Sequence, residues 1–145
     1  MFDSSSHFLI AHEWAYGLTE VFHIVSMAVG IGLIALVDLR VLGAGILPAS
    51  PQRLLRATMT ASMAGLIVAI TSGFLILSTD PVRYFNHPTM RLKLLLILVA
   101  LVFNYAVHNR LVSGGYSLMT SRCVAAGSLA IWVAIVFSGI FYAFT

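Results

Sequence analysis

The chain has 145 residues, of which 60% are hydrophobic and only 9% are charged, and its mean hydropathy is +1.00. Soluble domains carry about 25% charged residues, so this composition excludes an ordinary soluble enzyme, a disordered protein and a nucleic-acid binder. The net charge of +3 arises from 8 Lys and Arg against 5 Asp and Glu, an excess that basic membrane loops account for. Cys123 is the single cysteine, which excludes an internal disulfide and a metal site built on several thiolates.

Four apolar stretches predict four membrane-spanning helices. Crossing the hydrocarbon core as a helix takes about 20 apolar residues, and open strands are excluded because lipid offers no partner to unpaired backbone groups. We therefore expect an all-α fold, an integral membrane four-helix bundle, as a single transmembrane domain over residues 1–145. The expected helices cover approximately residues 11–38, 55–78, 88–109 and 121–144.

The distribution of Lys and Arg predicts the orientation of the bundle, because cytoplasmic loops carry the excess of basic residues. Five basic residues flank one end of the expected bundle, three flank the other, and both ends of the chain carry none. We therefore expect both termini outside and the first and third loops in the cytoplasm. The five are Arg40, Arg53, Arg56, Arg110 and Arg122, and the three are Arg83, Arg91 and Lys93.

Two of the expected helices carry small residues at every fourth position, a pattern that lets helix backbones approach closely in lipid. We expect both rows to be packing faces of the bundle. The second helix has Ala57, Ala61, Gly65, Ala69 and Gly73, and the fourth has Ala126, Ala130, Ala134 and Ser138.

The first expected helix carries polar residues inside its apolar stretch. Four residues spaced three or four apart share one face of this helix: Glu20, His23, Met27 and Gly30. A charged group exposed to lipid near the bilayer centre costs at least about 2.5 kcal/mol. This polar face is therefore expected to look into the bundle or toward a partner.

Three functions are open for this polar face. In the first, His23 is the axial ligand of a haem iron or another tetrapyrrole metal. Met27 and Gly30 then offer a soft contact and room for a flat ring, and Glu20 orients the imidazole. In the second, His12, Glu20 and His23 relay protons or bind a small metal ion. In the third, Glu20 and His23 only hydrogen-bond neighbouring helices and hold the bundle together.

Other candidates for this chemistry lie at other depths of the membrane. His87 and His108 are secondary candidates for a metal ligand, but their expected depths differ from that of His23 by on the order of 15 Å at 1.5 Å per residue. A haem on His23 therefore requires a five-coordinate metal, a methionine as sixth ligand, or a second copy of His23 across a two-fold axis. Arg91 and Lys93 are candidates to bind haem propionates near the outer interface, and lipid head groups are their alternative partner.

A second polar group is expected at the cytoplasmic ends of the first and third helices. Asp38 and Arg40 end the first helix, and Asn104 and His108, one turn apart, end the third. Asp38 can accept a hydrogen bond from His108 or from Arg40. The simplest interpretation is a structural polar cluster that fixes the inner ends of these helices.

Four short motifs are spread over nearly the whole chain: Glu20-x-x-His23, Asp38-Leu39-Arg40, Arg91-x-Lys93 and Asn104-x-x-x-His108. In these motifs the chain resembles a family of small, largely uncharacterised bacterial inner-membrane proteins with four helices. It departs from the family late in the fourth helix, where Gly139 is followed by Ile140 instead of arginine. The architecture is also similar to that of four-helix cytochrome b and copper-resistance membrane proteins, although architecture alone does not set function.

From the resemblance we expect a multi-pass protein of the bacterial inner membrane, in contact with the lipid bilayer and with other membrane subunits or a second copy of itself. The leading functional hypothesis is a small cytochrome-b-like subunit that binds haem b or a related tetrapyrrole and transfers electrons within a larger membrane complex. The alternative is a cofactor-free accessory subunit that stabilises such a complex. The sequence has no phosphate-binding loop and no nucleophile elbow, so we expect no catalytic residues and at most a subunit of an oxidoreductase complex.

Overall fold

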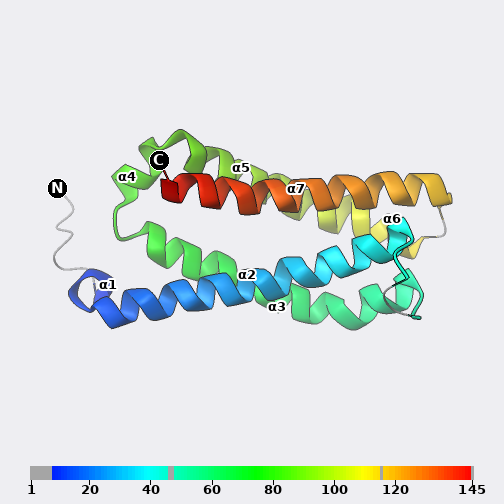
Figure 1. Cartoon of the computed structure of the whole chain (residues 1–145), viewed down its shortest axis with the longest axis horizontal. Coiled ribbons are helices and arrows are strands. Elements are labelled where there is room, and N and C mark those ends of the chain that lie inside the picture. The colour runs from blue at the N-terminus through cyan, green and yellow to red at the C-terminus, as the bar shows by residue number, and fades with distance from the viewer. Residues whose placement is uncertain (1–7, 46–47, 115, 145) are drawn as a thin grey trace.

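The computed structural model of the chain describes residues 8–45, 48–114 and 116–144, and helices form almost all of this part (Figure 1). Four of its segments are long and apolar enough to cross a membrane, which confirms the expected all-α membrane bundle. The third of these segments runs from α5 through a π-helix, η2. The elements are α1 (Phe8–Ala11), α2 (Glu13–Leu42), α3 (Pro51–Leu77), α4 (Pro81–Asn86), α5 (Pro88–Phe103), η2 (Asn104–His108), α6 (Asn109–Ser113) and α7 (Leu118–Phe144).

Caps and prolines set where two of the helices begin. The side chain of Ser50 accepts a hydrogen bond from the backbone N–H of Arg53, and Pro51 fills the first turn, where its missing N–H is not needed. Asp80 caps α4 in the same way, by accepting from the backbone N–H of Arg83 at 3.1 Å. α3 therefore starts before the expected residue 55, and the segment expected as a loop before residue 88 contains a short helix.

α2 ends at a glycine in the left-handed conformation. Gly43 has a φ of 107°, and its N–H donates to the carbonyl of Arg40. Glycine takes this backbone conformation without the strain that other residues suffer. The guanidinium of Arg122, from the start of α7, lies against Gly43, close to the negative end of the α2 dipole. The helix therefore continues beyond the expected residue 38, as far as Leu42.

α2 and α3 form the tightest helix pair of the bundle. Their backbones touch at Gly30 and Gly65, because a Cβ at Gly65 would lie 2.9 Å from both the backbone N of Gly30 and the carbonyl O of Ser26. Next to this crossing, the hydroxyl of buried Ser62 donates to the carbonyl of Gly30 at 3.0 Å. Two glycines thus allow an approach that any side chain at this crossing would prevent.

Only part of the two expected small-residue rows faces the bundle. In α3 the buried members are Gly65 and Ala69, whereas Ala57 and Ala61 are exposed. In α7 the expected row is exposed up to its last member, Ser138. The expectation fails because a four-residue step drifts by about 40° around a helix of 3.6 residues per turn, so a long row leaves the packing face. The buried face of α7 contains Ala125, Ser128, Trp132, Ile135 and Ser138.

The described chain starts and finishes at the same end of the bundle (Figure 1). α1, α4 and the last turn of α7 lie at this end, which we call the termini end. The opposite end, which we call the far end, holds the connection from α2 to α3, α6 and the start of α7. The orientation expected from Lys and Arg makes the termini end the outer one.

Large apolar side chains cover the outside of the bundle. Phe22 is 56% exposed, Leu98 is 60% exposed and Phe141 is 61% exposed. Soluble proteins rarely expose apolar surface on this scale, whereas a bilayer accommodates it without cost. The outer surface of the four long segments is therefore suited to contact with lipid.

Candidate functional site

His23 lies between α2 and α3, in the half of the bundle nearer the termini end, and is half-buried. Its Nδ1 is 2.8 Å from the carbonyl O of Ala69 and 3.3 Å from Oγ of Ser72. Because a carbonyl oxygen only accepts hydrogen bonds, we assign a proton to Nδ1, and in a neutral ring Nε2 then keeps its lone pair. Metal-binding histidines use this arrangement, with one nitrogen held by the protein and the other available to the metal.

All four long segments contribute to the surroundings of His23. A Cβ at Gly73 of α3 would lie 3.0 Å from Cε1 of the imidazole, so the ring packs directly on the α3 backbone. Glu20 of α2 and Lys93 of α5 both lie within electrostatic range of the ring. The Lys93 ammonium is packed against Gly139 of α7, and no carboxylate of the described chain pairs with it. The site therefore combines an imidazole with a half-buried lysine.

The other residues of the expected polar face on α2 lie differently. Glu20 is exposed, so its carboxyl does not point into the bundle. Met27 is half-buried. The expectation that Gly30 leaves room for a flat ring is wrong, because Leu66 of α3 occupies that space and would lie 3.0 Å from a Cβ there. Gly30 serves the crossing of two helices instead.

α4 carries an aromatic cluster at the termini end. The ring of Tyr84 stacks on Tyr142 of α7 with centroids 5.5 Å apart, and His87 meets Tyr142 edge-on at 4.9 Å. The side chain of Tyr16, from α2, lies close to Tyr84. His87 therefore joins this aromatic cluster, and Arg91, one turn further along α5, is exposed. The pair Asp80-Pro81 is a sequence signal for the start of a helix, from which α4 could have been predicted. The local sequence does not indicate which aromatic rings of the cluster contact one another.

A buried ion pair joins α2 to the third span. Nε2 of His108 lies 2.5 Å from Oδ1 of Asp38, and the two side chains are 1% and 0% exposed. The two atoms are within ion-pair distance, but their angles do not meet the criteria of a hydrogen bond. Nδ1 of His108 faces Oδ1 of Asn109 at 3.3 Å. Both ring nitrogens thus face protein oxygens. In this conformation neither nitrogen is available to a metal, for which His108 was a secondary candidate ligand.

The expected cluster at the far end forms without one of its four members. Arg40 does not reach Asp38, because its Nε donates to the carbonyl of Ala49 at 2.9 Å. Asn104 is buried, and its Oδ1 has no hydrogen-bond partner among the described residues. The sequence left open whether His108 or Arg40 is the partner of Asp38. The loop after α2 decides this, because it brings the carbonyl of Ala49 to Arg40.

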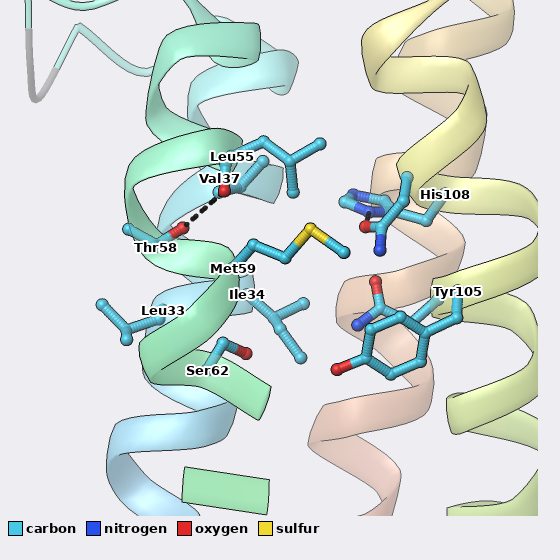
Figure 2. Close-up of a pocket in the computed structure, with 11 residues that line it drawn as sticks. Leu33, Ile34, Val37, Leu55, Thr58, Met59, Ser62, Tyr105 and His108 are labelled. Atoms are coloured by element: carbon cyan, nitrogen blue, oxygen red, sulfur yellow. Dashed lines mark hydrogen bonds between the residues drawn. The ribbon is translucent and has the colours of Figure 1, made fainter. Parts of the chain in front are cut away.

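A small, partly open cavity with about 10 Å³ of free space lies beside the ion pair, between α2, α3 and η2 (Figure 2). Asn104, Tyr105 and His108 line it from the π-helix side. Figure 2 shows the side chain of Met59 reaching from α3 toward His108. The free space at its centre suffices for about one water molecule.

Few side chains that could ligate a metal ion lie close together. Among residues 8–45, 48–114 and 116–144, no three His, Cys, Asp or Glu side chains gather closely enough to hold one. A haem would need less from the protein, namely one ligand atom and a space, and Nε2 of His23 is the candidate ligand atom. Two cavities stand out in the described chain, the one beside Asp38 and an apolar one of about 180 Å³ between α2 and α7, and His23 lines neither.

Comparisons with known proteins leave these sites to be interpreted from their own geometry. No family model, no curated protein and no solved structure matches the chain.

Proposed function

We propose that the chain is a small membrane subunit that holds haem b, or a related tetrapyrrole, through His23 and transfers electrons within a larger complex of the bacterial inner membrane. The observation that carries the proposal is the state of His23, whose Nδ1 is held 2.8 Å from the carbonyl of Ala69. A bond of this kind fixes the tautomer and raises the basicity of Nε2 as a ligand atom. A bound haem would supply one-electron redox chemistry, and the chain itself contributes binding and orientation.

Lys93 supports the same proposal. Its ammonium is half-buried within electrostatic range of His23, and no carboxylate of the described chain pairs with it. A cation removed from water favours an anionic group beside it, and a tetrapyrrole propionate is such a group. Arg91 is exposed at the same end, where it can bind a second propionate or a lipid head group.

The proposal includes a second copy of the chain or a partner subunit beside α2, because neither cavity reaches His23. In this half of α2, Ile24 is 58% exposed and lies one turn from the exposed carboxyl of Glu20, which shares a helix face with His23. A two-fold axis along this face would cover the apolar surface and set two His23 residues at equal depth, from which both could hold one haem.

The absorption spectrum of the gently purified protein in detergent tests the proposal. We expect the wild type to show the Soret band of a ligated haem and His23→Ala to lose or shift that band. His12→Ala is the matched control, because His12 is exposed and its Nδ1 bonds the carbonyl of Phe8 at 3.2 Å. A coloured His23→Ala protein with an unchanged spectrum rejects His23 as ligand, and a colourless wild type purified with its partners rejects the haem.

A cofactor-free accessory subunit is the second candidate, and the buried polar contacts favour it. His23 with Ala69, and Asp38 with His108, join separate helices, as polar residues that only stabilise a membrane bundle do. In this case the purified chain is colourless and co-purifies with a large membrane complex. His23→Ala then weakens the fold or the complex without any spectral change.

A further inference from the structure

The buried ion pair at the far end is a second polar site, separate from His23. We propose that Asp38 and His108 form a proton-binding site that exchanges protons with water through the cavity between α3 and η2. The proposal does not depend on a haem at His23, because the two sites share no residue and lie in different halves of the bundle. The simplest interpretation from the sequence was a structural polar cluster. A purely structural cluster requires neither the cavity nor proton exchange with water.

The proton balance of the pair follows from its geometry. At 2.5 Å, Nε2 of His108 and Oδ1 of Asp38 are in direct contact with no room for a water between them. In its neutral form the pair holds one proton, as carboxylate and imidazolium or as carboxylic acid and imidazole. Uptake of a second proton from water leaves one net positive charge, and release of the only proton leaves one net negative charge.

Few other charged groups act on the pair. Arg40, the next charge on α2, is bonded to a backbone carbonyl. α3 lines the cavity with apolar and hydroxyl side chains, and Tyr105 is the only further titratable group among the lining residues. The net charge at this position is therefore set by the pair's own protons. The other charged or titratable groups described at this end are exposed: Arg53, Arg56, Arg110, Tyr116, Arg122 and Cys123.

The cavity connects the pair to the surroundings of the bundle. It is partly open, and His108 and Asn104 both line it. Oδ1 of Asn104 is buried without a hydrogen-bond partner among the described residues, and buried amide oxygens that the protein does not satisfy are usually satisfied by water. A water in this cavity would thus lie beside both the unpaired amide and the imidazole, as transfer of a proton to the pair requires.

The π-helix is the local feature that builds this wall of the cavity. The backbone N–H of Asn109 donates to the carbonyl of Asn104, five residues earlier, rather than to the carbonyl four residues earlier. This wider turn begins at Asn104 and ends at His108, and both side chains are buried on the same cavity. Single π-helical turns are rare and are frequently found at functional sites.

The test measures the two side chains separately in the full chain in lipid bicelles, with isotope-labelled histidine rings and aspartate carboxyls read by NMR. The chain has only Asp3, Asp38 and Asp80 as aspartates, so Asp38→Asn identifies the Asp38 signal and His108→Gln identifies the His108 ring. When the pH is varied, we expect both signals to shift over the same pH interval, because a coupled pair takes up and releases its protons as one unit. We also expect the ring N–H to exchange with heavy water.

Met59 and Met63 provide a matched pair of variants. Both lie on α3 and are 38% and 39% exposed, but only Met59 lines the cavity. Met59→Ala removes the side chain that reaches toward His108, so we expect the His108 ring N–H to exchange several-fold faster, and Met63→Ala to leave the rate unchanged. Neither variant replaces a member of the buried pair. Signals that stay constant with pH, or equal exchange rates in the two variants, overturn the proposal and leave the pair as a structural contact.

Discussion

Two histidines of this chain are directed toward different chemistry by the atoms that face their rings. The carbonyl of Ala69 holds Nδ1 of His23, which leaves Nε2 for the proposed metal, whereas Nε2 of His108 lies against Oδ1 of Asp38. The residue type is the same, and both lie in membrane-spanning segments. The function of a buried histidine is thus decided by the group opposite each nitrogen.

We predict that Asp38→Ala strongly destabilises the bundle. Removing one member of a buried ion pair leaves its partner uncompensated and costs about 3–5 kcal/mol. The free energy of unfolding, measured by titration from mild to denaturing detergent, checks this value. Glu13→Ala is the control, because Glu13 is an exposed carboxylate on the same helix and its loss costs about 0.5 kcal/mol or less. Equal effects of the two substitutions would show that the pair adds nothing to stability.

We predict opposite effects for two glycine substitutions in and after α2. Gly43→Ala forces a side chain into the left-handed conformation at φ 107° and is expected to destabilise by about 1 kcal/mol. Gly17→Ala meets nothing within 4 Å and is expected to stabilise by about 0.5–1 kcal/mol, because alanine loses less backbone entropy in a helix. The same unfolding measurement separates them, and a common sign for both changes would contradict this account of the α2 end.

At the scale of elements, the crossing of α2 and α3 sets the framework on which both polar sites are built. Gly30 and Gly65 bring the two backbones into contact, and this contact places Ala69 and Gly73 opposite His23 on one side of the crossing. On the other side, α2 carries Asp38 toward η2. The position of each site thus depends on how far the two helices are apart and on how each is rotated about its axis.

We predict that Gly65→Ala damages this crossing. The added methyl would lie 2.9 Å from backbone atoms of α2, and because backbone cannot swing aside as a side chain can, the helices must separate at a cost of about 1–3 kcal/mol. The free energy of unfolding of the chain measures this loss directly. Gly127→Ala is the control, since a Cβ there would meet Phe103 at 3.6 Å, an ordinary contact, and a loss as large in Gly127→Ala would refute the explanation.

At the scale of the whole molecule, four spans return the chain to the end where it began. α1 and the last turn of α7 share the termini end (Figure 1), and the far end holds the connection after α2 and the start of α7. The far end also carries the larger share of the basic residues. Because basic loops stay in the cytoplasm, the far end and the Asp38–His108 pair are expected on the cytoplasmic side.

We predict that reporter fusions at Ser4 and at Thr145 both give signals from outside the membrane. The reason is the five-to-three distribution of Lys and Arg between the two ends, with none at either end of the chain. A fusion at Gly45, between α2 and α3, is the control and is expected to give a cytoplasmic signal. Cytoplasmic signals from both Ser4 and Thr145 would reverse the orientation of the whole bundle.

The sequence alone determined the class of fold and the main candidates. Lipid imposes length and helical structure on each span whatever its neighbours are, so apolar stretches sufficed to predict four helices. The spacing of polar residues within single helices likewise singled out His23 and placed Asp38, Asn104 and His108 at one end. These features are local, and local features can be read along the chain.

The tertiary structure decided which of these residues meet. Glu20 faces outward, Leu66 fills the space beside Gly30, and Arg40 bonds a loop carbonyl instead of Asp38. Apolar residues surround each spanning helix almost evenly, so no strongly amphipathic pattern marks its inner face. In lipid the rotation of a helix about its axis is set by close packing and by buried polar contacts rather than by hydrophobicity, and these contacts exist only once all the helices are together.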